Sequence, residues 1–183
     1  MRVQRGRLIE AKEKLVVSDI FIINLRVLVH MKIEPFILEQ CYAHGIDTYP
    51  KEACGLISGP IDQEELLLKV HRISNVMDKY HALYPKQYPR TNRDGYMIDP
   101  KEYIKLEDRL TQQGQKVKVV YHTHIGIGAF FSKIDKKYAL WDGEPSFPDV
   151  HYLVCGINNR QPADAILAVF NPVTKDFDVV RVK

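Results

Sequence analysis

Two histidines one residue apart and an aspartate shortly downstream form the most informative pattern in this sequence. His122 and His124 lie at the end of an apolar run, where alternating strand side chains would place both imidazoles on one face. Asp135 follows at the start of a predicted helix, so a carboxylate can join them. Zn²⁺ accepts imidazole and carboxylate ligands, and three protein ligands leave its fourth position open for water. An open position is typical of catalytic zinc, so the pattern predicts a zinc hydrolase.

Each of these residues also has a purely structural interpretation. The two histidines could be ordinary strand residues on a partly wet face. Ser132 and Asp135 fit a capping box, in which a serine and an acid three residues later satisfy free backbone N–H groups. Capping and metal binding are compatible, because one ligand bond needs only one carboxylate oxygen. Cys54 could be a thiol nucleophile, but the sequence identifies no basic neighbour that would lower its pKa, which favours a buried structural cysteine.

Length and charge limit the other functions open to the chain. With 183 residues and 45% apolar content, it is long enough for one well-filled core and short for two domains. Its net charge of +3 arises in residues 1–30, and residues 31–183 are balanced. The equal number of acidic and basic side chains in residues 31–183 argues against a nucleic-acid-binding surface, which needs clustered basic side chains. The odd number of cysteines, three, favours a reducing compartment over a disulfide scaffold.

The first thirty residues differ in character from the rest. The apolar segment Ile20–Val29 is too short to span a bilayer, and acidic residues precede it where a secretory leader would be basic or apolar. We therefore expect no membrane span and a cytoplasmic location. The segment that begins at Met31 resembles the start of a domain. We expect residues 1–30 to be an N-terminal extension and residues 31–183 to be the functional domain, with the purpose of the extension left open.

The elements that must position the chemical residues follow from hydrophobic periodicity and turn residues. The sequence predicts strands over residues 53–58, 66–73, 117–122, 150–157, 165–170 and 177–182. It predicts three helices: one from Pro35 to Gly45, one from the N-cap Asp99 to Gly114, and one from Ser132 to Asp142 with Ile134, Tyr138 and Trp141 facing the core. Residues 75–96 are predicted to be a long loop. This order indicates a single α/β domain with a helix-flanked sheet.

The run from His122 to Asp135 resembles the signature of the JAMM, or MPN-plus, metalloprotease family: His-x-His, seven residues, Ser, two residues, Asp. The family also has an upstream glutamate in a segment like Glu-x-Cys-Gly-Leu, and Glu52 occupies it here. The resemblance extends loosely from residue 31 to residue 182. It implies a mixed sheet flanked by helices, similar to the cytidine deaminase architecture. It also implies that His122, His124 and Asp135 hold zinc, that Glu52 is the general acid and base, and that Ser132 steadies the charged intermediate.

The chain departs from the family pattern between and after its histidines. Many members have His-Ser-His-Pro, whereas this chain has Thr123 and Ile125, followed by Gly126 and Gly128, which indicates a looser turn. The ligand types are unchanged. Rival zinc classes are disfavoured, because the sequence has neither the His-Glu-x-x-His helix of common zinc proteases nor the Cys-x-x-Cys of the zinc deaminases.

The resemblance implies hydrolysis of a peptide or isopeptide bond at the C-terminal tail of a ubiquitin-like or sulfur-carrier protein that ends in Gly-Gly. Two alternatives remain: a non-catalytic MPN scaffold that binds partners, and a zinc amidohydrolase that acts on a small-molecule amide. Four tyrosines could line a groove for the tail or merely anchor the long loop; they are Tyr80, Tyr84, Tyr88 and Tyr96. The sequence leaves the oligomeric state open.

Overall fold

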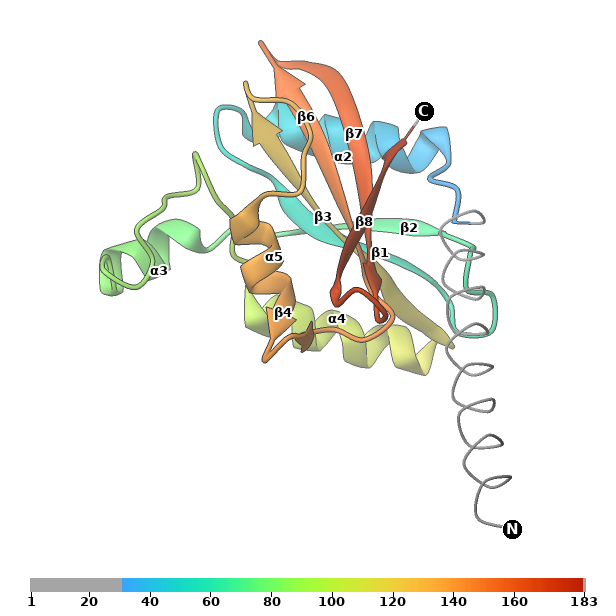
Figure 1. The fold of residues 1–183 in the computed structure, drawn as a ribbon. Coiled ribbons are helices and arrows are strands. Elements are labelled where there is room, and N and C mark those ends of the chain that lie inside the picture. Colours follow the sequence, from blue (N-terminus) through green and yellow to red (C-terminus); the bar gives the residue numbers. More distant parts are fainter. Residues whose placement is uncertain (1–30, 183) are drawn as a thin grey trace, which may run out of the picture.

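A six-stranded mixed sheet forms the centre of the computed structural model, which describes residues 31–182 (Figure 1). The predicted N-terminal extension therefore lies outside the described residues. The strand order is β2-β1-β3-β6-β7-β8; β3 and β6 are parallel, and all other neighbours are antiparallel. The strands are β1 (Cys54–Pro60), β2 (Lys69–Ile73), β3 (Gln115–Ile125), β6 (His151–Asn158), β7 (Gln161–Asn171) and β8 (Asp176–Val182). The predicted α/β class with a mixed sheet is confirmed.

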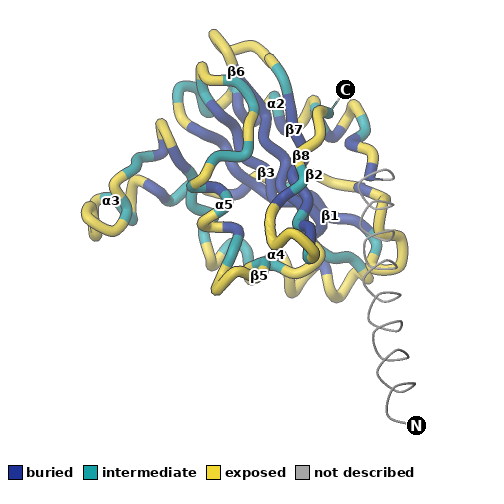
Figure 2. The backbone as a smooth tube through the Cα atoms, viewed as in Figure 1, coloured by how far each residue is buried: buried dark blue, intermediate teal, exposed yellow. Residues whose placement is uncertain are grey.

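Helices cover both faces of this sheet, and each face has its own apolar core. Helix α2 (Pro35–Thr48) lies on one face, where Ile37 packs with Val119 and Tyr121. Helices α4 (Pro100–Gln112) and α5 (Lys133–Ala139) lie on the other, where Leu106 packs with Val120. Figure 2 shows the central strands in the colour of buried residues and the outer parts of α4 in that of exposed ones. Within residues 31–182, no helix has both the length and the apolar character to cross a bilayer.

The first helix runs past the glycine that was predicted to end it. Gly45 lies inside α2, which continues to Thr48. A Cβ at Gly45 would come 2.8 Å from Cγ2 of Thr123 and 2.9 Å from Cγ1 of Ile157. This glycine therefore permits a close approach of the helix to the sheet and does not act as a helix terminator.

Two further predictions of local structure were wrong. The segment predicted as a loop contains helix α3 (Met77–Leu83), which projects from the side of the sheet in Figure 1. Helix α5 ends at Ala139, and a short hairpin follows, formed by β4 (Leu140–Trp141) and β5 (Glu144–Pro145). Tyr138 and Trp141, predicted to face the core, are 42% and 81% exposed. In α5 the buried residues are Asp135 and Ala139, which puts Tyr138 on the outer side, and Trp141 lies beyond the helix in the hairpin.

We predict that Gly45→Ala lowers the free energy of unfolding by about 1 to 2 kcal/mol. Overpacking against the sheet should cost about 2 to 3 kcal/mol, the upper part of the usual range, because two atoms would lie closer than 3.0 Å to the new Cβ. The higher helix propensity of alanine offsets about 1 kcal/mol of this. Urea unfolding followed by circular dichroism measures the change. Glu39→Ala, an exposed position on the same helix, is the control and should stay within about 0.5 kcal/mol of the wild type. A Gly45→Ala protein as stable as the wild type would contradict the close-packing interpretation.

Candidate metal centre

Three ligand atoms converge at one buried point of the structure. Nε2 of His122 lies 3.2 Å from Nε2 of His124 and 3.5 Å from Oδ1 of Asp135, and Nε2 of His124 lies 3.7 Å from Oδ2 of Asp135. Ligands bound to a tetrahedral zinc at about 2.0 to 2.1 Å are separated from one another by about 3.3 Å. The three residues are buried, and their ligand atoms all lie within 4.8 Å of one another. The donor types and the spacing both fit a divalent metal ion.

The histidines are positioned by the central strand of the sheet. In β3, Val120 belongs to the apolar core under α4 and α5, and His122 and His124 continue its row because strand side chains alternate. The backbone of β3 is held from both sides, since His122 is opposite Cys54 of β1 and Val154 of β6. The predicted strand ended at His122, whereas β3 continues to Ile125 and carries both imidazoles.

The aspartate is positioned by the first turn of α5. Oγ of Ser132 accepts a hydrogen bond from the backbone N–H of Asp135 at 3.1 Å, and Oδ2 of Asp135 accepts one from the N–H of Ser132 at 2.7 Å. The predicted capping box is therefore confirmed. Because Oδ2 makes the capping bond, Oδ1 is the oxygen left free to face His122. The hydroxyl of Ser132 accepts in the cap, and its own hydrogen remains able to donate to another group.

Neighbouring groups fix the orientation of both imidazoles. Nδ1 of His124 lies 3.2 Å from the carbonyl oxygen of Gly128, which can only accept, so the proton sits on Nδ1 and the Nε2 lone pair points to the other ligands. The ring of Tyr96 stacks on His122 with centroids 4.2 Å apart, and Phe130 packs edgewise on His124 at 4.8 Å. These contacts depend on tertiary packing. The sequence pointed to Gly128 only as part of a looser turn, not as a partner of His124, and did not identify Phe130 at all.

Burial and hydrogen bonding keep His122 and Asp135 in the forms that bind metal. Burial lowers the pKa of His122, which favours the neutral imidazole. For Asp135, burial alone would raise the pKa, but hydrogen bonding with His122, His124 and Ser132 outweighs burial and holds it below its usual range. Metal binding needs a neutral imidazole and an ionised carboxylate. The site is therefore prepared for a cation near neutral pH.

Glu52 lies just before β1, two residues from the strand position that pairs with His122. Its side chain is only 5% exposed. Burial raises the pKa of Glu52 to about 8, with a further contribution from the negative charge of Asp135. An isolated glutamate before a strand is usually a solvated surface residue, and the burial of Glu52 rules out this interpretation. A carboxyl group with a pKa near neutrality can both accept and return a proton.

Cys54 is a poor candidate for the nucleophile. Its thiol is buried, burial raises its pKa well above the ordinary value, and its Sγ lies 3.7 Å from the carbonyl oxygen of Ile73. A thiol in this environment stays protonated and inert. Cys54 is therefore a packing residue, as the sequence favoured.

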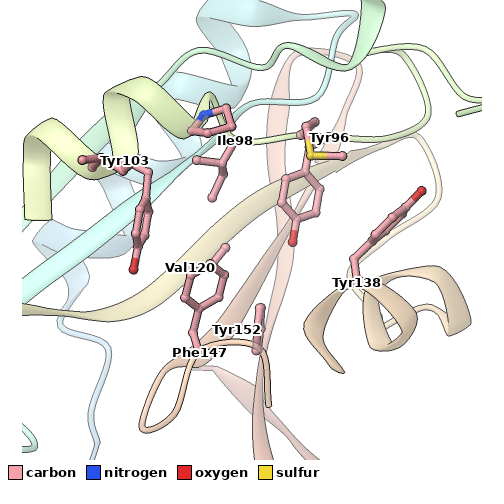
Figure 3. Close-up of a pocket in the computed structure, with 10 residues that line it drawn as sticks. Tyr96, Ile98, Tyr103, Val120, Tyr138, Phe147 and Tyr152 are labelled. Carbon is pink, nitrogen blue, oxygen red and sulfur yellow. The ribbon is translucent and has the colours of Figure 1, made fainter. Parts of the chain in front are cut away.

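A mainly apolar pocket of about 360 Å³ opens on the same face of the sheet (Figure 3). Its wall includes Tyr96, Ile98, Tyr103, Val120, Phe147 and Tyr152. Val120 precedes His122 by two residues on the strand, which separates them by about 7 Å. Tyr96 connects the two regions, because its ring stacks on His122 and also forms part of the pocket wall.

The four tyrosines considered as a possible groove have different positions. Tyr96 lines this pocket, as Figure 3 shows. Tyr80 and Tyr88 instead pack against each other with ring centroids 5.2 Å apart, and Tyr84 is exposed. Only Tyr96 of this set contacts a predicted metal ligand.

Comparisons with known proteins add independent information. Residues 36–167 match a family described as prokaryotic homologs of the JAB domain. The CysO-cysteine peptidase of Mycobacterium tuberculosis (strain H37Rv) is 26% identical over 125 residues, covering 66% of this chain and 67% of that protein. The desampylase of Haloferax volcanii is 27% identical over 114 residues, covering 62% and 68%.

Solved structures support the fold. The solution structure of a protein from Salinibacter ruber has a TM-score of 0.56 and 24% identity, covering 83% of this chain and 90% of that chain. Protein DSY2949 from Desulfitobacterium hafniense has a TM-score of 0.56 and 20% identity, covering 79% and 86%. At these identities the likeness concerns the architecture alone.

We predict that the purified protein carries about one divalent metal ion per chain and that His122→Ala and Asp135→Asn each reduce metal content at least about 10-fold. Removing one of three ligands leaves too few donors to retain the ion. Metal analysis of the dialysed protein by mass spectrometry measures this. His81→Ala removes a histidine of helix α3 and should leave the metal content unchanged. Equal metal in the wild type and all three variants would contradict the assigned centre.

We predict that the metal-free protein loses stability as pH rises, through Glu52. Its pKa is near 4.5 when unfolded and about 8 when folded, so the folded form keeps a proton that the unfolded form releases. The resulting stabilisation is fully present below pH 4.5 and is lost as pH rises through 8. Between pH 5.5 and 7.5 the wild type should lose about 1.4 kcal/mol per pH unit relative to Glu52→Gln. Urea unfolding of both proteins across this range measures it, and parallel curves would contradict it.

Proposed function

Because this chain belongs to the prokaryotic JAB family, we propose that it is a zinc metallopeptidase that hydrolyses an amide bond at the C-terminal tail of a ubiquitin-like or sulfur-carrier protein. The observation that best supports this proposal is the buried group formed by His122, His124 and Asp135. Glu52 is also buried, lies two residues before the strand position that pairs with His122, and has a pKa raised in part by the charge of Asp135. The names of two relatives, CysO-cysteine peptidase and desampylase, support the substrate class.

The roles of the residues follow from their chemistry. A divalent metal held by His122, His124 and Asp135 would polarise the scissile carbonyl and lower the pKa of a water molecule. Glu52 takes a proton from the attacking water on a carboxylate oxygen and later passes it to the leaving amine. A cation nearby would favour the ionised form of Glu52, which is the form that accepts this proton.

Ser132 stabilises the charge that develops on the carbonyl oxygen. Its hydroxyl lone pair is occupied by the N–H of Asp135, so its hydrogen can be directed elsewhere. This bond also holds the hydroxyl oxygen beside Asp135. A well-placed donor of this kind contributes about 100-fold or more in rate.

The surroundings of the centre support an extended tail as the substrate. Tyr96 and Phe130 lie against the two imidazoles, and large rings there favour glycine, which has no side chain, at the scissile bond. The apolar pocket begins about 7 Å away along β3, or two residues of an extended chain, and its volume suits an apolar side chain of the tail.

The same pocket supports a second candidate function, hydrolysis of a small-molecule amide, because its volume of about 360 Å³ is within the range of small-ligand sites. A non-catalytic scaffold is less well supported, since nothing would then favour a complete ligand group with a buried carboxyl beside it. We further propose that residues 31–183 form the catalytic domain and that residues 1–30 are an extension. The three buried free thiols support a cytoplasmic location.

We predict that the zinc-loaded protein releases a Gly-Gly-tailed carrier protein from a cysteine or lysine conjugate. Glu52→Gln should lower kcat by about 10²- to 10⁴-fold with metal retained, because proton transfer is lost. Ser132→Ala should lower kcat by about 10²- to 10³-fold, and Ser132→Thr, which keeps both the hydroxyl and the cap, should restore most of it. Mass spectrometry of the products measures each rate.

Two outcomes would decide against this proposal. Absence of cleavage across several carriers by fully metallated protein would remove the substrate claim. Hydrolysis of small amides by the same preparation would then favour the second candidate. Full activity of Glu52→Gln would remove the acid and base role from Glu52.

A further inference from the structure

The backbone around Glu52 is held by hydrogen bonds on both sides. Its N–H donates to the carbonyl of Asn92 at 2.7 Å, and its carbonyl accepts from Nδ2 of Asn75 at 2.9 Å. The next residue, Ala53, donates its N–H to Oγ1 of Thr123 at 2.8 Å and accepts from the N–H of Thr123 at 3.0 Å. Glu52 precedes β1, so these bonds supply the support that the sheet ladder does not.

Asn75 connects Glu52 to the segment that carries Tyr96. Besides its bond to Glu52, Nδ2 donates to the carbonyl of Gly95 at 3.1 Å, and Oδ1 accepts from the N–H groups of Met77 and Met97, both at 3.1 Å. The side-chain amide thus makes four hydrogen bonds to backbone groups. Tyr96 lies between two of the bonded residues and stacks on His122. One side chain therefore fixes both Glu52 and the ring that orients a metal ligand.

Thr123 connects Glu52 to the strand that carries the ligands. It lies between His122 and His124, its side chain points to the opposite face of β3, and it is completely buried. Its methyl group is the atom nearest to the position that a Cβ would take on Gly45 of α2, at 2.8 Å. Its hydroxyl accepts from Ala53. Serine at this position would keep the hydroxyl and lose the methyl group, whereas valine would do the reverse.

We propose that Asn75 and Thr123 are positioning residues that together fix the Glu52 carboxyl relative to the group formed by His122, His124 and Asp135. The proposal rests on the proposed function, in which Glu52 moves the proton. Neither residue touches the reacting atoms. Both act through the backbone of residues 52 and 53, and a displacement of about 1 Å in a catalytic group can lower a rate about 100-fold.

The experiment compares two pairs of variants in the full chain loaded with zinc. Thr123→Val removes the hydroxyl at nearly constant shape, and Thr123→Ser keeps it. Asn75→Ala is paired with Asn171→Ala, because Asn171 also bonds two backbone N–H groups through Oδ1 and one side chain through Nδ2, at the end of β7. Asn171→Ala therefore controls for a general loss of stability.

The expected result is a kcat lower by about 10- to 100-fold in Thr123→Val and Asn75→Ala, with KM and metal content within about threefold of the wild type. Thr123→Ser and Asn171→Ala should keep kcat within about threefold. Amide hydrogen exchange, followed by NMR, provides a readout that needs no substrate. Exchange at Glu52 and Ala53 should accelerate at least about 10-fold in the first two variants and stay near wild type in the two controls.

Three results would overturn the proposal. The first is unchanged exchange at the amides of Glu52 and Ala53, and the second is an unchanged kcat, in Thr123→Val and Asn75→Ala of an active enzyme. The third is an equal loss of kcat in Thr123→Ser and Thr123→Val, which would assign the effect to the methyl group. If the wild type cleaves no carrier, the proposed function fails, and the exchange comparison still decides on the positioning role. If Thr123→Val does not fold, the positioning role is decided by comparing kcat and amide exchange in Asn75→Ala with those in Asn171→Ala.

Discussion

The pairing between β1 and β3 is the constraint on which the candidate site depends. It sets Cys54 opposite His122 and thereby brings Glu52 close to ligands that lie seventy residues further along the chain. Because strand side chains alternate, a slip of one residue would turn both imidazoles to the α2 side of the sheet. The parallel pairing of β3 with β6 holds the same strand from the other side. The position of the candidate metal centre is therefore decided by the register of the sheet.

The pKa values of two carboxyl groups, Asp135 and Glu52, are shifted in opposite directions. Hydrogen bonds hold the pKa of Asp135 low, whereas burial raises that of Glu52 to about 8. The ionised carboxylate of Asp135 contributes to the second shift by repelling negative charge on Glu52. Near neutral pH such environments leave one carboxyl group ionised and let the other hold or release a proton. The separation of the two pKa values comes from their different surroundings, with two buried histidines and the Ser132 hydroxyl beside Asp135 and desolvation acting on Glu52.

The sequence could predict features that depend on local backbone periodicity, and it failed where distant segments decide. The capping box of Ser132 and Asp135 and the N-cap Asp99 were predictable, because each involves residues within one helical turn. The stacking of Tyr96 on His122 joins segments separated in the chain, and no local pattern encodes it. Gly45 was misread because the same residue type ends helices and permits close packing. The roles of the five predicted site residues remain predictions, although the structure gathers the three proposed ligands at one point.

The single tryptophan of the chain, Trp141, gives this protein an unusual optical property. It is 81% exposed on the hairpin that directly follows α5, between Tyr138 and Phe147 of the pocket wall. Its emission should therefore resemble that of indole in water in both the folded and the unfolded chain, so intrinsic fluorescence is a poor monitor of unfolding. The same exposure makes it a sensitive reporter of association. A protein that covers this hairpin while its tail enters the pocket would shift the emission to shorter wavelengths without any label.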